Sequence, residues 1–243
     1  MRKYINSFIW IGGAYIAIWL WLLFEKMPLT GGNICMLDGC VHMMRPLRYS
    51  IVMVIPMILQ TFFVFRYQFS TAYVLRYHRW QELLHAQWKQ CAVQALLYAG
   101  IFIAFCCLMQ YGSGVPFFNW DMENSYFAWQ AKTTMLLHPA EVIGYLWLMC
   151  AIRNFFIQSI LLFFMWLNAF LPGVMLLCVI SCFEIAQAKV RIFYWLISPD
   201  YSVWSSRGYR IDMMIGICLY IMLGIKAYRY VLRRKELLAI EKD

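Results

Sequence analysis

Residues 49–65 read YSIVMVIPMILQTFFVF and contain no charged side chain, although Arg48 precedes them and Arg66 follows them. A helix needs about 17–25 apolar residues to cross a hydrocarbon core about 30 Å thick, so this stretch is predicted to span a membrane. The composition agrees, because 63% of the 243 residues are hydrophobic and 14% are charged, whereas soluble domains average about 45–50% apolar and about 25% charged residues. We therefore expect lipid around most of the chain.

Three other runs satisfy the same criterion, and in the middle of the chain Arg153 separates an eleven-residue apolar stretch from one of thirty residues. Thirty residues are too many for one span and few for two, so the turn residues Asn168 and Pro172-Gly173 are taken to divide this region into two helices. The six predicted spans are residues 8–24, 49–65, 91–110, 140–167, 171–189 and 211–231. Six spans return the C-terminus to the side of the N-terminus, and both ends are basic. The prediction is an all-α, polytopic protein of the plasma membrane, with one transmembrane domain over residues 1–243 and both termini in the cytoplasm.

The segment LRYHRWQELLHAQWKQC, residues 75–91, connects the second and third spans. Apolar side chains spaced by three and four residues form one stripe, and charged side chains occupy the rest of the helical surface. The stripe consists of Tyr73, Tyr77, Trp80, Leu84 and Trp88. This pattern predicts a cytoplasmic amphipathic helix, which either anchors at the membrane interface or docks a cytoplasmic partner.

A second aromatic segment, VRIFYWLISPDYSVWSSRGYR at residues 190–210, precedes the last span. It is too charged to cross the membrane, so we expect an interfacial or re-entrant piece, or a loop with aromatic anchors.

Arg153 is the one cation predicted deep inside a span. A charge in the membrane interior costs about 3 kcal/mol on insertion scales unless it is paired or hydrated. Glu184 and Glu141 are the candidate partners. The intramembrane polar set Arg153, Glu184 and Glu141 is either a structural ion pair or the polar lining of a translocation path.

Cys35 and Cys40 lie in GGNICMLDGC, a predicted polar loop outside the cytoplasm, where they could form a disulfide in an oxidising compartment. A zinc site with Asp38 and His42 is a weaker alternative because the loop offers few anionic ligands. His78, Glu82 and His85 share a helix face, but no second Glu-x-x-His pair accompanies them, so no metal site is assigned. The other cysteines are interpreted as small apolar residues.

The sequence contains no phosphate-binding G-x-x-x-x-G-K-[ST] loop, no G-x-S-x-G elbow and no H-E-x-x-H pair. We therefore assign no catalytic residue and no cofactor to the chain. The net charge of +9 arises from cations that flank the apolar runs, which indicates topology and contact with anionic lipid and not nucleic-acid binding.

The length, the six spans and the two aromatic segments resemble the permease subunit of an ABC transporter of the ABC-2 type, especially the short permeases of bacteriocin or lantibiotic export and immunity. The resemblance implies that ATP-Mg is hydrolysed by a separate ATP-binding cassette subunit, and that a second copy or a related permease completes the transporter. It also implies that residues 193–204 lie at the outer leaflet. The residues implied to couple to the ATPase are Arg76, His78, Arg79, Trp80, Glu82, Leu83 and Leu84.

The expected function is export of an amphipathic peptide or lipid-like molecule. Two other hypotheses remain open at this point. One is a membrane-embedded lipid-modifying enzyme in which Arg153, Glu141, His138 and Glu184 meet at one site. The other is a non-catalytic membrane immunity or scaffold protein.

Overall fold

The computed structural model describes residues 33–77, 79–111, 114–186, 201, 204 and 207–240. Within these residues the secondary structure is helical, apart from an isolated bridge between Asn33 and Ser125. This confirms the all-α class for the part of the chain that is described. The elements are α2 (Met36–Met43), α3 (Pro46–Tyr49), the π-helical turn η1 (Ser50–Val54), α4 (Ile55–Gln68), α5 (Thr71–Val74), α6 (Trp80–Tyr111), α7 (Tyr126–Ala131), α8 (Pro139–Trp166), α9 (Phe170–Ala186) and α12 (Arg207–Ile240).

Four helical stretches are long and apolar enough to cross a membrane, as a multi-pass membrane protein requires: Pro46–Gln68, Trp80–Leu108, Pro139–Trp166 and Met213–Arg233. They correspond to four of the predicted spans. The helix predicted at 171–189 is α9, whose 17 residues extend about 26 Å, less than the roughly 30 Å of a hydrocarbon core. The span predicted at 8–24 lies outside the described residues.

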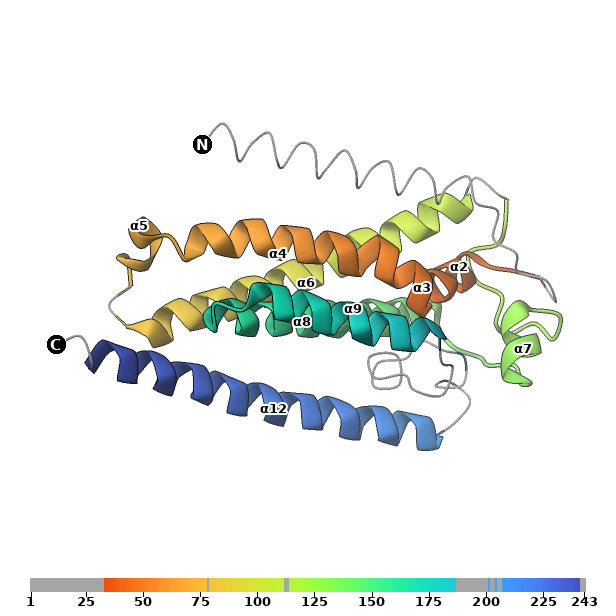
Figure 1. Cartoon of the computed structure of the whole chain (residues 1–243). Coiled ribbons are helices and arrows are strands. Elements are labelled where there is room, and N and C mark those ends of the chain that lie inside the picture. The colour runs from red at the N-terminus through yellow and green to blue at the C-terminus, as the bar shows by residue number, and fades with distance from the viewer. Residues whose placement is uncertain are drawn as a thin grey trace.

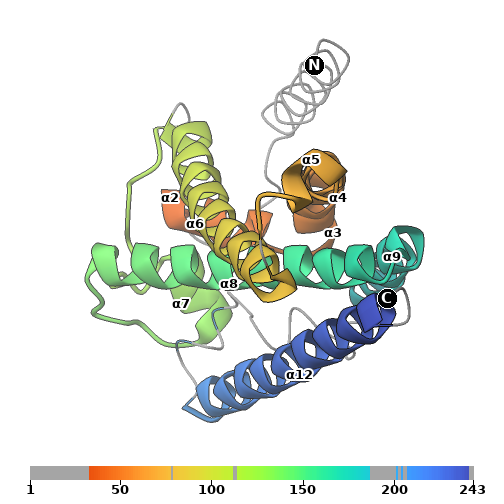
Figure 2. The same cartoon turned by 90° about the vertical axis from the view of Figure 1, so that its left-hand side faces the viewer.

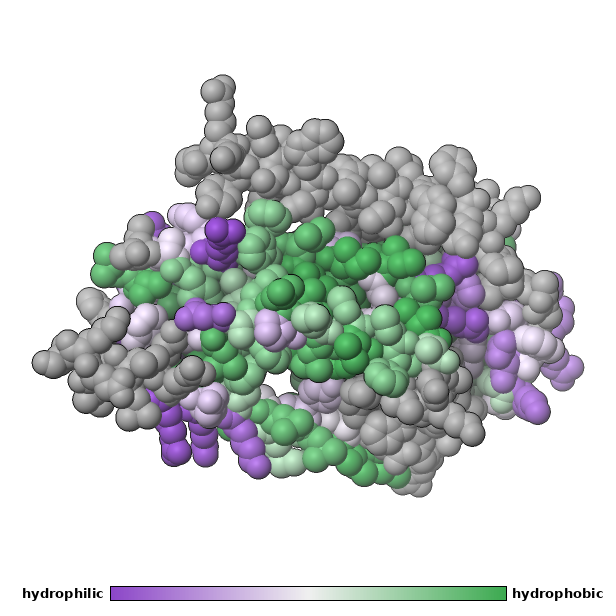
Figure 3. Space-filling view, in the orientation of Figure 1, coloured by the Kyte–Doolittle hydropathy of each residue, from purple (hydrophilic) through white to green (hydrophobic). Residues whose placement is uncertain are grey.

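In the view of Figure 1 the long helices α4, α6, α8, α9 and α12 extend across the molecule from side to side, and Figure 2 shows that α8 and α12 are tilted relative to α4. The short helix α5 and the C-terminal part of α12 are at one end of this bundle, and α2, α3 and α7 are at the other. Seen along the bundle, α4 and α6 lie on one side of α8 and α12 lies on the other (Figure 2). Since α8 contacts α4, α6, α9 and α12, it is the central helix. On the face seen in Figure 3, apolar side chains fill the middle and hydrophilic ones gather toward the two ends.

The cytoplasmic amphipathic helix predicted as a separate element is instead the beginning of α6. Residues 80–111 form one continuous helix of 32 residues, and no proline or glycine interrupts it before Gly100. Its buried positions recur every three or four residues on a single face, which packs against α8. These positions include Leu83, Gln87, Cys91, Ala95, Ala99, Phe102 and Cys106. Of the predicted aromatic stripe, Leu84 is buried, and the other four residues are partly buried against a core cluster that includes side chains of α4, α8 and α12.

The turn between α8 and α9 falls where the sequence predicts it. Asn168 adopts the left-handed backbone conformation with φ 56°, which asparagine tolerates better than most residues. Pro172 and Gly173 do not form the turn, because they lie in the first turn of α9, where proline is tolerated. A Cβ at Gly173 would lie 2.8 Å from Cβ of Phe164, so this glycine is required for the close approach of α9 to α8.

The segment predicted as an outer polar loop is the buried helix α2, in which every residue from Met36 to Met43 is buried. Asp38 explains why it folds. One carboxylate oxygen accepts the backbone N–H of Cys35 at 2.9 Å, which caps the helix. The other accepts Nε1–H of Trp120 at 2.9 Å and the hydroxyl of Tyr201 at 2.8 Å. A carboxylate with three donors can be buried, and here it anchors α2 against distant parts of the chain.

Candidate functional site

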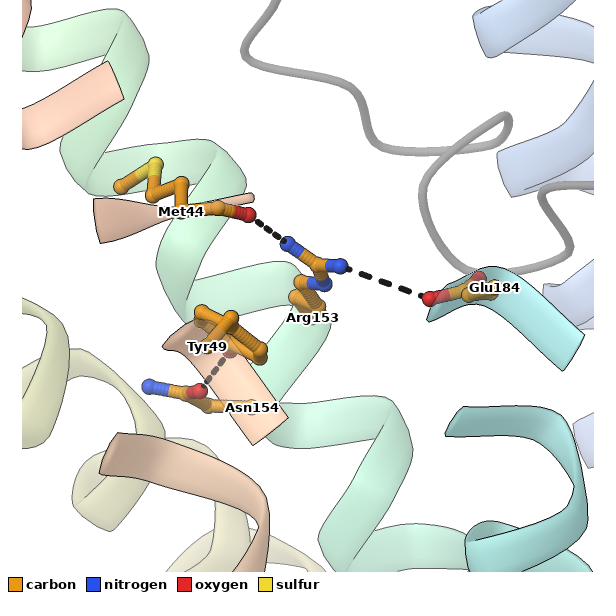
Figure 4. A network of polar contacts seen from close by, with 5 residues as sticks. All are labelled: Met44, Tyr49, Arg153, Asn154 and Glu184. Atoms are coloured by element: carbon orange, nitrogen blue, oxygen red, sulfur yellow. Dashed lines mark hydrogen bonds and ion pairs between the residues drawn. The ribbon is translucent and has the colours of Figure 1, made fainter. Parts of the chain in front are cut away.

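Arg153 lies in the middle of α8, 14 residues after its first residue, and is 3% exposed. One guanidinium nitrogen donates to the backbone carbonyl of Met44 at 3.0 Å, and another lies 3.7 Å from a carboxylate oxygen of Glu184 (Figure 4). The guanidinium carbon is 3.9 Å from the centre of the Tyr49 ring. A single side chain thus connects α8 with the end of α2, with α3 and with α9.

The ion pair between Arg153 and Glu184 is fully enclosed, since the two side chains are 3% and 4% exposed. Burying two charges is favourable only when their remaining donors and acceptors are also satisfied. Arginine suits this position because its planar fork of donors can serve a carboxylate and a carbonyl at once and can stack on an aromatic ring. Loss of either partner would leave an uncompensated charge in an apolar surrounding.

A second polar contact lies beside this pair. The hydroxyl of Tyr49 donates to the side-chain oxygen of Asn154 (Figure 4), and the amide nitrogen of Asn154 lies 3.7 Å from Sγ of Cys150. Tyr49 ends α3 directly before the π-helical turn η1, a kind of turn that often occurs at functional sites. Gln158 is 1% exposed one turn beyond Asn154, and neither polar atom of its side chain has a hydrogen-bond partner within the described structure.

Tyr49 and Asn154, which form this second contact, and Gln158, which is buried beside it without a hydrogen-bond partner in the described structure, were not predicted as site residues. A signal was available for two of them, because Asn154 and Gln158 are polar residues four positions apart in an apolar run that also contains Arg153. No sequence signal marked Tyr49, which lies 105 residues from Asn154 in the chain.

Glu141, the other candidate partner of Arg153, is not part of the network. It is exposed in the first turn of α8, and the 12 intervening steps of helix separate it from Arg153 by about 18 Å along the axis. His138 precedes the same helix and accepts the backbone N–H of Ala140 at 3.3 Å. The four residues of the lipid-enzyme hypothesis therefore do not meet: Arg153 and Glu184 pair inside the bundle, and Glu141 and His138 lie at its end.

The residues proposed to couple to an ATPase divide into two groups. Arg76, Arg79 and Glu82 are exposed at the end of the bundle that carries α5 (Figure 1). Leu83 and Leu84 are 0% and 3% exposed in a core cluster with side chains from α4, α8 and α12, so their side chains pack inside the bundle. Trp80 is half-buried in the same way, and His78 lies outside the described residues.

Aromatic packing holds this exposed group in place. Trp166 at the end of α8 makes edge-to-face contacts with Trp80 and Phe69, with ring centres 5.9 and 5.4 Å apart, and its Nε1–H donates to Gln87 at 2.8 Å. Tyr73 and Tyr77 share a hydrogen bond of 3.3 Å between their hydroxyls, which raises the pKa of Tyr73 to about 12. The segment from α5 to the start of α6, residues 71–82, is called the elbow below.

The two ends of the bundle differ in charge. Among side chains that the structure describes, the α5 end exposes seven cations and one carboxylate, Glu82. The α2 end exposes two cations and three carboxylates, and it also contains two half-buried cations and the buried Asp38. The exposed cations of the α5 end are Arg66, Arg76, Arg79, Lys89, Lys226, Arg229 and Arg233; those of the α2 end are Lys132 and Arg210, with Arg45 and Arg48 half-buried; its exposed carboxylates are Asp121, Glu123 and Glu141.

The α2 end also contains an aromatic cap that the sequence did not reveal. Trp120 stacks on Phe127 with ring centres 4.4 Å apart, and both rings contact Tyr201. Burial raises the pKa of Asp38 above its usual value, although its hydrogen bonds oppose this shift. Of the predicted interfacial segment at 190–210, most residues lie outside the described part, and Tyr201 is buried within this cap.

The cysteines and histidine near this cap are buried. Cys35 and Cys40 are both free thiols, and burial raises the pKa of Cys35 to about 12. Burial and the nearby Arg48 and Arg45 lower the pKa of His42 to about 4. Within the described residues, no group of three or more His, Cys, Asp or Glu side chains is arranged to hold a metal ion.

When compared with known proteins, the chain matches no protein-family model, no curated protein and no solved structure.

Proposed function

We propose that the chain is the membrane-spanning permease subunit of an ABC transporter that exports an amphipathic peptide or lipid-like molecule, with ATP-Mg hydrolysed by a separate ATP-binding cassette subunit. The observation that carries the proposal is the elbow: an exposed, charged surface fixed by aromatic packing at the first turns of a helix that continues through the bundle. Such an arrangement suits the transmission of force from a soluble partner into the membrane.

The charge distribution supports the orientation that this proposal requires. Cations are enriched on the cytoplasmic side of membrane proteins, and the described exposed side chains carry a surplus of six positive charges at the α5 end and a surplus of one negative charge at the α2 end. The elbow would therefore face the cytoplasm, where ATP and the partner are. Both termini would lie on the same side, in a plasma membrane.

The path from the elbow to the interior is short and rigid. Helix α6 has 32 residues, which is about 48 Å, and it packs along α8, the helix that carries Arg153. A displacement of the elbow would move α6 against α8, and the links from Arg153 to Met44 and Glu184 would pass that movement to α2 and α9.

The elbow's exposed chemistry fits a partner with acidic and apolar groups. Arg76 and Arg79 are exposed there, and Leu75 between α5 and α6 is 78% exposed. An apolar side chain that projects among cations at the bundle end is suited to insertion into a groove of another protein, since its burial would contribute about 2 kcal/mol.

The test is to isolate the tagged chain from the membranes of its own host in mild detergent. We expect an ATP-binding cassette protein to accompany it, recognised by its Walker A sequence and by photolabelling with an azido-ATP analogue. Substitution R79E should lower its recovery about tenfold, which corresponds to about 1.4 kcal/mol. The matched control is R210E, an exposed cation at the opposite end of the bundle, which should leave recovery unchanged. Isolation of the chain alone, or equal losses with R79E and R210E, would contradict the proposal.

A further inference from the structure

Three thiols gather where α2 lies against the last turns of α6. Cys40 belongs to α2, while Cys106 and Cys107 belong to α6. The Sγ atoms of Cys40 and Cys107 are 3.9 Å apart, and Cys106 also makes a side-chain contact with Cys40. The two helices approach closely here, because a Cβ added to Gly39 would lie 2.8 Å from Cγ of Gln110. Residues 67 positions apart in the chain are thus brought within reach of one covalent bond.

The geometry does not favour the pairing of Cys35 with Cys40. Cys35 caps α2 and Cys40 lies five residues further along it, which corresponds to an axial separation of about 7.5 Å and opposite sides of the helix. The Cα atoms of a disulfide are usually about 4.4–6.8 Å apart. Their pairing would require α2 to unwind and would break the bond from the Cys35 N–H to Asp38.

Exposure distinguishes Cys107 from Cys106. Cys106 is 0% exposed, whereas Cys107 is half-buried one turn before the end of α6. Of the three thiols only Cys107 has exposed surface, and it is the second-last residue of the membrane-spanning stretch Trp80–Leu108, so it lies at the edge of the membrane where an external disulfide can contact it. Cys40 is 0% exposed beneath it and is placed to react second.

The side of the membrane on which the two thiols would lie also favours a disulfide. In the orientation proposed above, on which this inference rests, the α2 end faces away from the cytoplasm. Disulfides form and persist outside the cytoplasm, while cytosolic thiols are kept reduced.

We propose that Cys40 and Cys107 form a disulfide that fastens α2 to α6 at the outer end of the bundle. The Cys107 thiol loses its proton as its sulfur attacks the disulfide of an external thiol–disulfide oxidoreductase, which forms a mixed disulfide and releases the first sulfur of the oxidant as a thiol. The Cys40 thiol then loses its proton as its sulfur attacks Sγ of Cys107 and displaces the second sulfur of the oxidant as a thiol. One S–S bond forms in the chain and one breaks in the oxidant, which leaves with two thiols that carry the two electrons and two protons.

The bond would fix the cap built around Asp38 onto the membrane bundle. A link across 67 residues removes much of the conformational freedom of the unfolded chain, and the stabilisation grows with loop length. Reduction would leave α2 held by side-chain packing and by noncovalent bonds such as those of Asp38 and the one from Arg153 to the Met44 carbonyl.

The first experiment maps the thiols of the full chain in membranes quenched with N-ethylmaleimide, then digested without reduction. A peptide that joins Cys40 to Cys107 is expected. Complete alkylation of both residues, or a peptide that joins Cys40 to Cys35 or to Cys106, would overturn the proposal.

The second experiment measures thermal unfolding in detergent, with and without dithiothreitol. Reduction should lower the midpoint of the wild type by on the order of 10 °C and should not affect C107S. The control C178S, which replaces an exposed cysteine of α9, should respond to dithiothreitol like the wild type. An equal response of C107S and C178S to dithiothreitol would overturn the proposal.

Labelling of E123C in intact cells with a membrane-impermeant maleimide separates this inference from the proposed orientation, because Glu123 is exposed at the α2 end. Free Cys40 and Cys107 with E123C labelled from outside would overturn the disulfide alone. Free thiols with E123C protected would overturn the disulfide and the orientation together.

Discussion

Substitution of Arg153 by methionine tests the role of the central network most directly. The substitution keeps a long apolar side chain but removes the contact with Glu184, the hydrogen bond to the Met44 carbonyl and the stacking on Tyr49. Breaking a buried ion pair from one side costs about 3–5 kcal/mol, because the remaining charge is uncompensated. For a chain of this size, that loss lowers the midpoint of thermal unfolding by about 6–20 °C.

The partner substitution E184Q should cost less than R153M. Glutamine retains an oxygen that can accept from Arg153, and the guanidinium keeps the Met44 carbonyl and the Tyr49 ring. The double variant R153M/E184Q should be more stable than the sum of the single effects predicts, with an interaction energy of about 1–3 kcal/mol, because residues in contact are not additive.

The assay is thermal unfolding in detergent, followed with a thiol-reactive fluorophore that reports exposure of the buried cysteines. The matched control is E141Q, which removes an exposed carboxylate from the same helix α8 and should change the midpoint by less than about 2 °C. An interaction energy near zero, or an effect of E141Q equal to that of E184Q, would refute the assignment of Glu184 as the partner of Arg153.

Three further predictions use residues outside the network. G173A should destabilise the protein by about 1–2 kcal/mol, because its Cβ would overlap Phe164. A Cβ added at Gly144 would meet open space, so G144A should stabilise α8 by up to about 1 kcal/mol. Both predictions are checked by comparing the thermal unfolding midpoints of the two variants with that of the wild type. The pKa of His42 is lowered to about 4 in the folded protein, whereas an unperturbed histidine has a pKa of about 6.5. As the pH falls below about 6.5, His42 is therefore protonated in the unfolded chain before it is protonated in the folded one. The contribution of neutral His42 to the free energy of unfolding is therefore fully present above that pH and declines by about 3 kcal/mol as the pH falls to about 4. The substitution H42Q should remove this part of the pH dependence when unfolding is measured over that pH range.

Each of these outcomes has a clear opposite. Equal midpoints of G173A and G144A would mean that α9 does not need its close approach to α8. An unchanged pH profile in H42Q would show that protonation of His42 does not oppose folding.

The surrounding medium and the helical class were determined by the sequence alone. Uncharged runs such as residues 49–65 can satisfy their backbone groups in lipid only as helices, so composition and run length are sufficient. The turn at Asn168 was also predictable, because its chemistry is local. The presence of a buried cation in α8 followed from Arg153 standing inside an apolar run.

The prediction for residues 75–91 was wrong because two kinds of helix share one sequence pattern. An apolar stripe opposite charged residues predicts an amphipathic helix, but this periodicity does not say whether lipid headgroups or protein covers the apolar face. In the structure Leu83, Leu84 and Cys91 are buried together with side chains of α4, α8 and α12. The prediction of a polar loop at GGNICMLDGC was wrong for a related reason. The carboxylate of Asp38 is buried because it accepts hydrogen bonds from Trp120 and Tyr201, which lie in remote parts of the chain.

Only the tertiary structure decided which groups meet. Sequence reasoning offered Glu184 and Glu141 as equal partners of Arg153, and the packing of α9 against α8 selected Glu184, while the axial rise of α8 carries Glu141 to the end of the bundle. Likewise, Cys40 finds Cys107 through the contact of α2 with α6. Hydropathy is a property of consecutive residues, so it can be read from the sequence. An ion pair or a thiol pair depends instead on the distance in space between segments that are far apart in the sequence.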